Sequence, residues 1–416
     1  MINFSLGIDF GTSGARGIVI DRANKVLTKV DLKFANLKEN NLALNWQIAL
    51  FNLIEKIPLE TRKKIGAIAI NGTSSTVLLC DRIGNPLAEP IWYNDNRGLE
   101  VLDKLKKVAP PNHVVLSATS SLAKLFWWQE KPVYKDARYF LHQADWLAFL
   151  LDGKLGISDY HNALKLGYDP GNLCYPNWLD NLPIRDILPE VLAPGTAIKE
   201  IKPEIGDRFG LPKSCIVYTG TTDSIAAFLA SGAKTPGEAV TSLGSTLVLK
   251  LLSRNRVDNA QYGIYSHKLG DLWLTGGASN TGGAVLAKFF TPEELIKYSD
   301  RIDTNTIGSL DYYPLLKPGE RFPINDPNLK PKLAPRPQDP KEFLHGLLES
   351  MAKIEARGYQ LLQDLGADRL TKVYTAGGGA KNQVWSKIRQ RYLQVDVIES
   401  VNTSAAYGTA LLAKQN

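Results

Sequence analysis

Apolar residues in the first eighty positions form short runs separated by small polar residues, and this pattern predicts strands. Leu6 to Ile8 and Gly17 to Ile20 are two such runs, joined by Gly11-Thr12-Ser13-Gly14. Because these small residues tolerate positive φ angles, the pattern predicts a β-hairpin. Further apolar runs at 65–70 and 77–80 predict two more strands.

Helical spacing of apolar residues occurs at 144–151 and 225–230 and is most extended after residue 340. There Asp339 as N-cap and Pro340 at the first position predict a helix start, and Gly366 ends the apolar stripe. The thirty residues from Asp311 to Pro340 contain eight prolines, which predicts an extended connection that leads into this helix. Four short elements are expected after it, a strand at 373–375, a helix at 384–393, a strand at 395–398 and a helix at 404–413. Strands that alternate with helices indicate an α/β architecture.

An internal repeat links the two halves of the chain. Residues 239–249 again read as a strand, a turn with hydroxyl residues and a strand, so that Gly11-Thr12-Ser13 aligns with Gly244-Ser245-Thr246 and Asp9 with Ser242. This duplication predicts two related domains facing each other across a cleft, although a coincidence would explain the same pattern.

Composition excludes several classes of protein. The 416 residues are 44% hydrophobic and 22% charged, which is typical of a globular chain of two or three domains. The net charge of +7 suits anionic small ligands but is too diffuse for a nucleic-acid interface. We expect no signal peptide and no membrane span, and therefore a cytoplasmic protein.

Cysteine and histidine show no metal-ligand spacing. The three cysteines, Cys80, Cys174 and Cys215, are expected to be reduced packing residues. The five histidines are expected to be structural or solvent-facing, and no Ser/His/Asp set stands out as catalytic.

The segment from Asp9 to Arg16 is the sharpest candidate site. Gly11 lets the backbone approach a phosphate closely, and Thr12 and Ser13 can donate hydrogen bonds to its oxygens. Asp9, at the end of a strand, is suited to hold Mg²⁺, which takes one or two carboxylates and keeps several waters. The alternative is an ordinary turn with an aspartate cap.

A second candidate is the run Gly377-Gly378-Gly379, followed by Asn382, at a strand-to-helix junction. Without side chains, these glycines would leave room for a flat ring or a phosphate beside the positive end of a helix. The alternative is a tight turn. Neither G-x-x-x-x-G-K-S/T nor G-x-G-x-x-G after a strand occurs, so a nucleotide would be held differently.

Two further segments carry polar groups suited to a sugar. Asp223 follows a predicted strand and can be a helix N-cap or a general base that accepts a proton from a sugar hydroxyl. Between Trp92 and Arg97, aromatic faces lie beside Asp95, which suits a polyol surface as well as a plain surface turn.

Together these residues resemble the FGGY family of carbohydrate kinases, nearly from end to end and in the same order. The corresponding motifs here are Asp9-Phe10-Gly11-Thr12-Ser13, Asn71-Gly72-Thr73-Ser74-Ser75 through Asp81, Trp92 with Asp95 and Arg97, Gly220 to Asp223, Leu243-Gly244-Ser245-Thr246, Lys317 to Arg321 with Pro323, Gly377 to Asn382 with Trp385, and Ala406 to Ala410.

The resemblance implies an α/β fold of two actin-like (ribonuclease H-like) domains facing a central cleft, the superfold that actin and hexokinase share. We expect a sugar-binding domain at 1–222 and a nucleotide-binding domain at 223–416, with the last helix packing back at the hinge.

The resemblance also implies a role for each matched position. Asp223 would be the base, Asp9 a magnesium and sugar ligand, and Thr12 a contact of the transferring phosphate. Sugar would contact Asp9, Ser74, Ser75, Trp92, Asp95 and Asp223. Nucleotide would contact Gly11, Thr12, Ser13, Arg16, Gly244, Ser245, Thr246, Gly377, Gly378 and Asn382.

The implied activity is ATP- and Mg²⁺-dependent phosphorylation of a sugar by a monomer or homodimer. The chain is shorter than most family members, and Thr73-Ser74-Ser75 stands where many of them carry bulkier polar residues. This departure argues against a glycerol kinase and favours a ketopentose, D-ribulose ahead of D-xylulose. The alternatives are a kinase for another polyol, a non-catalytic sugar or nucleotide sensor, another actin-like phosphotransferase and a chaperone ATPase.

Overall fold

The computed structural model describes residues 4–36, 39 and 41–414, which form two compact units. Unit 1 contains the described residues up to Ala230 together with those from Ser404 onward, and unit 2 contains Ser231–Thr403. Residues 223–230, which the sequence analysis assigned to the second domain, therefore lie in unit 1. The reason is packing, because Ala230 is buried with Ile18 and Ile20 of the first hairpin.

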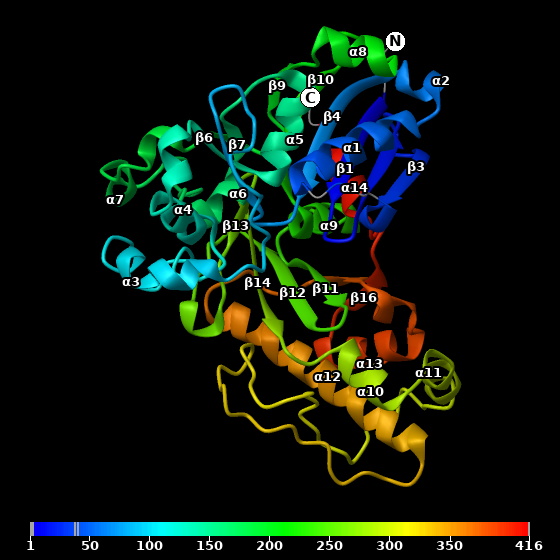
Figure 1. The fold of residues 1–416 in the computed structure, drawn as a ribbon. Coiled ribbons are helices and arrows are strands. Elements are labelled where there is room, and N and C mark those ends of the chain that lie inside the picture. Colours follow the sequence, from blue (N-terminus) through cyan, green and yellow to red (C-terminus); the bar gives the residue numbers. More distant parts are fainter. Residues whose placement is uncertain (1–3, 37–38, 40, 415–416) are drawn as a thin grey trace. The chain divides into compact units, whose positions relative to one another are not determined.

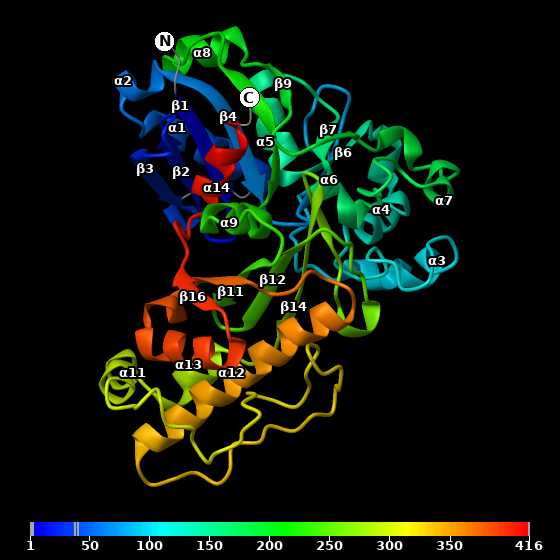
Figure 2. The ribbon, with the colours of Figure 1, turned by 180° about the vertical axis from the view of Figure 1, so that it is seen from behind.

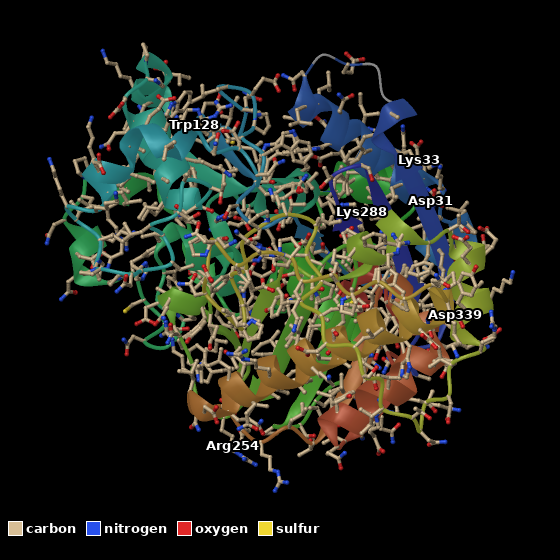
Figure 3. All side chains as sticks on the ribbon, turned by 90° about the horizontal axis from the view of Figure 1, so that it is seen from below. Asp31, Lys33, Trp128, Arg254, Lys288 and Asp339 are labelled. Carbon is tan, nitrogen blue, oxygen red and sulfur yellow. The ribbon has the colours of Figure 1, made fainter. Side chains whose placement is uncertain are left out.

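Unit 1 is built on a six-stranded mixed sheet in the order β3-β2-β1-β4-β10-β9. Strand β4 runs parallel to both β1 and β10, so the carboxyl ends of these three strands meet at one edge of the sheet. On the edge strand β3, the charged Asp31 and Lys33 are exposed (Figure 3). The strands are β1 Phe4–Phe10, β2 Gly14–Ile20, β3 Val26–Lys33, β4 Ile65–Gly72, β9 Ala197–Glu200 and β10 Ile216–Thr222.

Helices cover both faces of this sheet. Leu6, Ile8 and Phe10 of β1 lie in one core with the apolar sides of α1 (Leu42–Glu55) and α5 (Gln143–Asp152). The opposite face packs against α9 (Asp223–Ser231) and α14 (Ala405–Leu412). Figures 1 and 2 both show α14, from the end of the chain, against β1 from its beginning.

The remainder of unit 1 surrounds a separate apolar core. Strands β5 (Val77–Cys80) and β6 (Tyr139–His142) pair antiparallel beside α4 (Ser121–Gln129), and β7 (Ile157–Asp159) pairs with β8 (Glu190–Leu192). Short helices complete the unit at Phe34–Asn36, Leu59–Arg62, Arg97–Val101, Leu102–Leu105, Pro132–Asp136, Tyr160–Ala163, Leu164–Leu166, Asn177–Asp180, Arg185–Ile187 and Pro203–Phe209.

Unit 2 contains a second six-stranded mixed sheet, in the order β13-β14-β12-β11-β15-β16. Its strands are β11 Glu238–Leu243, β12 Leu247–Ser253, β13 His267–Leu269, β14 Leu272–Ser279, β15 Lys372–Ala376 and β16 Asp396–Glu399. Its helices are α10 Gly283–Phe289, α11 Pro292–Ser299, α12 Pro340–Asp364 and α13 Gln383–Leu393, with short turns of helix at Ala260–Tyr262 and Gly378–Lys381.

Helix α12 begins where the sequence predicts. The Asp339 side chain accepts a hydrogen bond from the Lys341 N–H at 2.9 Å, and Figure 3 labels this residue at the start of the helix. Gly366, with φ of 105°, follows its end. The proline-rich connection has no helix or strand between Asp311 and Asp339, as expected.

The internal repeat is confirmed by the topology of the two sheets. In each, the first strand of a hairpin (β1 or β11) pairs in parallel with a strand from much later in the chain (β4 or β15). A further parallel strand, β10 or β16, follows on the far side.

Burial agrees with the sequence analysis for two cysteines. Cys80 and Cys215 are buried in the core of unit 1, whereas Cys174 is exposed and is not the packing residue that we expected. Among the residues described, no helix has both the length and the apolar composition needed to cross a bilayer.

The terminal helix approaches its neighbours at two glycines. A Cβ at Gly7 of β1 would lie 2.1 Å from the Ala406 carbonyl oxygen, and a Cβ at Gly408 would lie 1.8 Å from that of Ala226 in α9. Backbone atoms cannot yield as side chains do, so α14 requires glycine at both contacts.

Replacing Gly408 by alanine should therefore lower the free energy of unfolding by about 3 kcal/mol, because the cost of overpacking against a backbone exceeds the gain in helix propensity. Urea denaturation measures the change. Gly378→Ala is the control, since no atom lies within 4 Å of the added Cβ. An unchanged midpoint for Gly408→Ala would contradict the close packing.

Candidate active site

Two carboxylates meet at the edge of the unit 1 sheet where the parallel strands end. Asp9 of β1 pairs in register with Asn71 of β4, and Asn71 pairs with Thr221 of β10. Asp223 follows β10 directly as the first residue of α9. The sheet thus brings residues 9 and 223 to the same edge, one strand apart.

Asp9 is electrostatically strained. It is 6% exposed, and burial raises the pKa of its carboxyl group to about 6, with the negative charge of Asp223 adding to the effect. Arg16 opposes both, with its Nη1 3.8 Å from Asp9 Oδ2. A cation bound beside Asp9 would relieve this strain.

Asp223 also contributes to the start of its helix. Its Oδ1 accepts a hydrogen bond from the Ser224 N–H at 2.7 Å, so the carboxylate orders the first turn of α9. The two interpretations of Asp223, as a cap of the helix and as a general base, are therefore compatible.

Buried side chains fix the strand ends that carry these carboxylates. The Asn71 amide Nδ2 donates to Thr409 Oγ1 of α14 at 2.6 Å, and Thr221 Oγ1 lies 2.7 Å from His161 Nδ1. The terminal helix α14 is thus joined to the sheet by a side-chain hydrogen bond as well as by the close backbone contact at Gly7.

The turn between β1 and β2 presents its hydroxyl groups to solvent. The Gly11 N–H donates to the Gly14 carbonyl at 3.0 Å, which closes the turn, and Thr12 and Ser13 are exposed. These two hydroxyl groups are open to a ligand at the sheet edge that holds Asp9.

The predicted sugar segment forms a tight turn after β4. The Thr76 N–H donates to the Thr73 carbonyl at 3.1 Å, and Ser75 has φ of 65° in the left-handed region. Ser74 is half-buried and Ser75 is buried.

The segment 92–97 lies beside this turn, because the Tyr93 N–H donates to Thr76 Oγ1 at 3.0 Å. Trp92 packs edge-on against Trp46 at 5.5 Å between ring centroids, and Tyr93 is the more exposed ring. Whether Trp92 contacts sugar, as the resemblance implies, stays a prediction.

Asp95 and Arg97 neutralise each other in the same segment. Arg97 donates from Nε to Asp95 Oδ1 at 2.9 Å and from Nη2 to Oδ2 at 2.7 Å. These hydrogen bonds lower the pKa of the Asp95 carboxyl group. The Arg97 guanidinium also stacks over the Trp127 ring at 4.6 Å.

Unit 2 holds a pocket of about 750 Å³ at the corresponding edge of its own sheet. Four of the six unit 2 residues predicted to bind nucleotide line it, namely Gly244, Ser245, Gly378 and Asn382, whereas Thr246 and Gly377 do not. Its apolar walls come from Leu243, Leu286, Ala287, Leu295, Ile296, Val384 and Trp385. Such a pocket suits a flat ring, with glycine and hydroxyl groups at one side for phosphates.

The three consecutive glycines, 377–379, differ in backbone conformation and in the space around them. Gly377 has φ of 85°, a Cβ at Gly379 would lie 2.7 Å from the Trp385 ring, and a Cβ at Gly378 would meet nothing within 4 Å. Gly378 and Gly379 both line the pocket, but of the three glycines only Gly378 could carry a side chain into open space.

Asn382 shapes the pocket through both ends of its amide. Oδ1 accepts from the Trp385 N–H at 2.9 Å and caps α13, while Nδ2 donates to Ser299 Oγ at 2.8 Å. The side chain joins α11 to α13 across the pocket wall.

Glu320, in the predicted Gly-Glu-Arg-x-Pro element, orders the loop that follows β14. Its buried carboxylate accepts hydrogen bonds from Ser279 Oγ at 2.5 Å and from the Asn280 N–H at 2.8 Å. We assign this element a structural role in unit 2.

Sequence reasoning missed a buried Ser–His–Asp array. Ser121 Oγ lies 3.0 Å from His142 Nε2, and His142 Nδ1 lies 3.0 Å from Asp145 Oδ2. The serine and histidine are 0% exposed, so neither is open to solvent, and this array ties α4, β6 and α5 together. His142 and Asp145 are neighbours at the start of α5, but Ser121 lies 21 positions before His142, and no local motif signals that the two meet.

A second missed residue is Lys124, which is 0% exposed within α4. A single lysine inside the apolar run Leu122-Ala123-Lys124-Leu125-Phe126 is the signal that could have revealed it.

Comparison with known proteins agrees with this arrangement. The profile of the FGGY family of carbohydrate kinases, N-terminal domain, matches residues 4–230, and that of the C-terminal domain matches residues 239–414. The chain belongs to the FGGY family of carbohydrate kinases. The predicted two-domain α/β fold is thereby confirmed.

The relatives found are distant but nearly full-length. A xylulose kinase of Bacillus subtilis is 24% identical, over 99% of this chain and 88% of that protein. A gluconokinase of the same organism is 23% identical, over 96% and 84%. A crystal structure described as a xyloylose kinase from Brucella ovis has the same fold, with a TM-score of 0.85, 22% identity and coverage of 99% and 90%.

The strained carboxylate of Asp9 gives this FGGY kinase a pH-dependent stability. Its folded pKa of about 6 exceeds the ordinary 3.8, so ionisation disfavours folding, and stability falls as the pH rises through that window. Asp9→Asn should raise the free energy of unfolding by about 3 kcal/mol at pH 8 and by about half as much at pH 5.

Urea denaturation at both pH values, with a chelator present, measures this effect. Asp103→Asn is the control, because that side chain is 92% exposed. Equal stability of Asp9→Asn and the parent protein at pH 8 would contradict the strain.

Proposed function

We propose that this FGGY kinase transfers the γ-phosphoryl group of ATP to the terminal hydroxyl of a ketopentose. The observation that carries the proposal is the meeting of Asp9 and Asp223 at the carboxyl edge of one sheet. The small Ser74 and Ser75 favoured D-ribulose in the sequence analysis, and the relatives named xylulose kinase make D-xylulose the second candidate.

Asp223 would act as the general base. It accepts the proton of the sugar hydroxyl while the hydroxyl oxygen forms a bond to the γ-phosphorus. The bond from that phosphorus to the β–γ bridging oxygen breaks, and ADP leaves. Such proton transfer contributes about 10²–10⁴-fold to the rate.

The residues present fit a magnesium ion. Among the residues described, no three His, Cys, Asp or Glu side chains gather into a complete metal site. Mg²⁺ needs only one or two carboxylates when phosphates and waters supply its other ligands. Asp9 would hold it, and the ion would neutralise phosphate charge.

The pocket of unit 2 supports the nucleotide part of the proposal. Its apolar walls suit a base, and the Gly244-Ser245 turn, in which Ser245 is exposed, and Gly378 suit the sugar-phosphate part. In unit 1, Thr12 and Ser13 would contact the transferred phosphate.

The positively charged side chains of Arg97 and Lys124 already make hydrogen bonds within the protein, which supports an uncharged acceptor sugar over an acid sugar such as gluconate. Arg97 is held by both oxygens of Asp95, and Lys124 donates to backbone carbonyls while completely buried. Neither is placed to meet a substrate carboxylate.

A coupled assay of ADP release tests the proposal with D-ribulose, D-xylulose, pentitols, glycerol, hexoses and D-gluconate. We expect turnover with a ketopentose and a kcat/KM for gluconate at least about a hundredfold lower. ³¹P NMR of the product identifies the phosphorylated position. Binding of ATP without turnover of any acceptor would favour a sensor, and a preference for gluconate would overturn the ketopentose assignment.

Asp223→Asn isolates the base, because the amide oxygen can still accept from the Ser224 N–H. We expect kcat to fall at least about a hundredfold while ATP binding, measured by calorimetry, stays within about twofold. Asp223→Ala should lose as much activity. Near-normal turnover of the Asn variant would remove Asp223 from this role.

A side chain at Gly378 tests the nucleotide pocket. Gly378→Val should weaken ATP binding at least about tenfold without lowering the melting temperature, because its Cβ enters open space. Gly379→Val is the contrasting variant and should destabilise the protein through the Trp385 and Leu243 clashes. Unchanged ATP affinity in Gly378→Val would place the nucleotide elsewhere.

A further inference from the structure

Lys124 occupies an unusual position for a charged residue. It lies in the middle of α4 and is 0% exposed, between Ala123 and Leu125, which are equally buried. An ammonium group in an apolar core is costly unless hydrogen bonds satisfy it.

Two backbone carbonyls from different segments accept hydrogen bonds from this ammonium group. Nζ donates to the Ser75 carbonyl at 2.8 Å and to the Trp92 carbonyl at 2.7 Å. In the described part of the chain no carboxylate lies within ion-pair distance of it. Lys124 therefore joins the turn 73–76 to the segment 92–97.

One of these carbonyls belongs to a strained residue. Ser75 has φ of 65°, which residues with a side chain rarely adopt, and its buried Oγ has no partner. Such conformations persist only where surrounding contacts enforce them. The bond from Lys124 and the Thr73–Thr76 turn bond hold the residue from both sides.

The charged groups around Lys124 do not make this connection pH-dependent. Burial lowers the pKa of the Lys124 ammonium to about 7, the Asp95 carboxylate opposes the shift, and Lys165 and Arg97 reinforce it. A neutral amine still has two N–H groups, one for each carbonyl. The connection therefore persists when the proton is lost.

We propose that Lys124 is a positioning residue for the acceptor sugar, which fixes the turn 73–76 against the segment 92–97 without touching the substrate. This inference rests on the proposed function and on the prediction from the sequence that Ser74, Ser75 and Asp95 contact the sugar. Loss of the lysine would loosen both segments together and weaken sugar binding more than nucleotide binding.

Lys124→Met tests the connection, because methionine keeps an unbranched apolar chain and removes the donors. Hydrogen exchange should become at least about tenfold faster at the amide of Thr76, which is bonded within the turn, and at that of Tyr93, which is bonded to Thr76 across the two segments. Lys56→Met is the matched control, since Lys56 Nζ also donates to a backbone carbonyl, that of Asp31, elsewhere in unit 1. It should leave both amides unchanged.

Kinetics give the second readout. In Lys124→Met, the KM for the best acceptor of the screen should rise at least about tenfold while the KM for ATP stays within about twofold. Because the connection persists when Lys124 loses its proton, titration of Lys124 near pH 7 should not change the KM of the parent protein for this acceptor. Should the Met variant fail to fold, Lys124→Gln, which is shorter and keeps one amide donor group, is measured in the same way and should give an intermediate KM.

The outcomes separate the two proposals. If no sugar is phosphorylated by the parent protein, the proposed function fails, and hydrogen exchange still decides whether Lys124 joins the segments. Unchanged exchange in Lys124→Met overturns the inference, as does faster exchange with an unchanged KM for the sugar. A parallel rise in both KM values would indicate a general structural role and also overturns it.

Discussion

The parallel pairing of β4 with both β1 and β10 is the constraint on which the candidate site depends. It sets Asp9, Asn71 and Thr221 side by side in register, although Asp9 and Thr221 lie more than two hundred positions apart in the chain. Because side chains alternate along a strand, a slip of one residue would turn Asp9 into the apolar core. The sheet is therefore also the element that selects which polar groups meet.

The same edge combines groups that are unfavourable for stability. Asp9 is a buried carboxylate beside a second negative charge, Ser75 is in the left-handed region, and Lys124 is an ammonium group inside an apolar core. Each is held by well-packed surroundings, namely the sheet, the turn 73–76 and α4. Strain of this kind concentrates at sites that bind or react.

The sequence predicts the features that are encoded locally. The first hairpin, the Asp339 cap of α12 and the repeated hydroxyl turn depend on neighbouring residues, and all three are confirmed. The contacts of Lys124 with residues 75 and 92, and those of Ser121 with His142, depend on how distant segments pack, and no local pattern carries that information. The meeting of Asp9 with Asp223 followed only from the family resemblance and the internal repeat. The end of unit 1 after Ala230 likewise reflects tertiary packing.

The position of α14 has a consequence for synthesis of the protein. Unit 2 is one continuous stretch of chain and is translated completely before the last helix, whereas unit 1 begins with the first strand and is completed by that helix. Until α14 has been translated, the surface formed by Gly7 and Ala226 lacks its cover. The packing around the sheet edge that bears both carboxylates is therefore completed only after the whole of unit 2 has been translated.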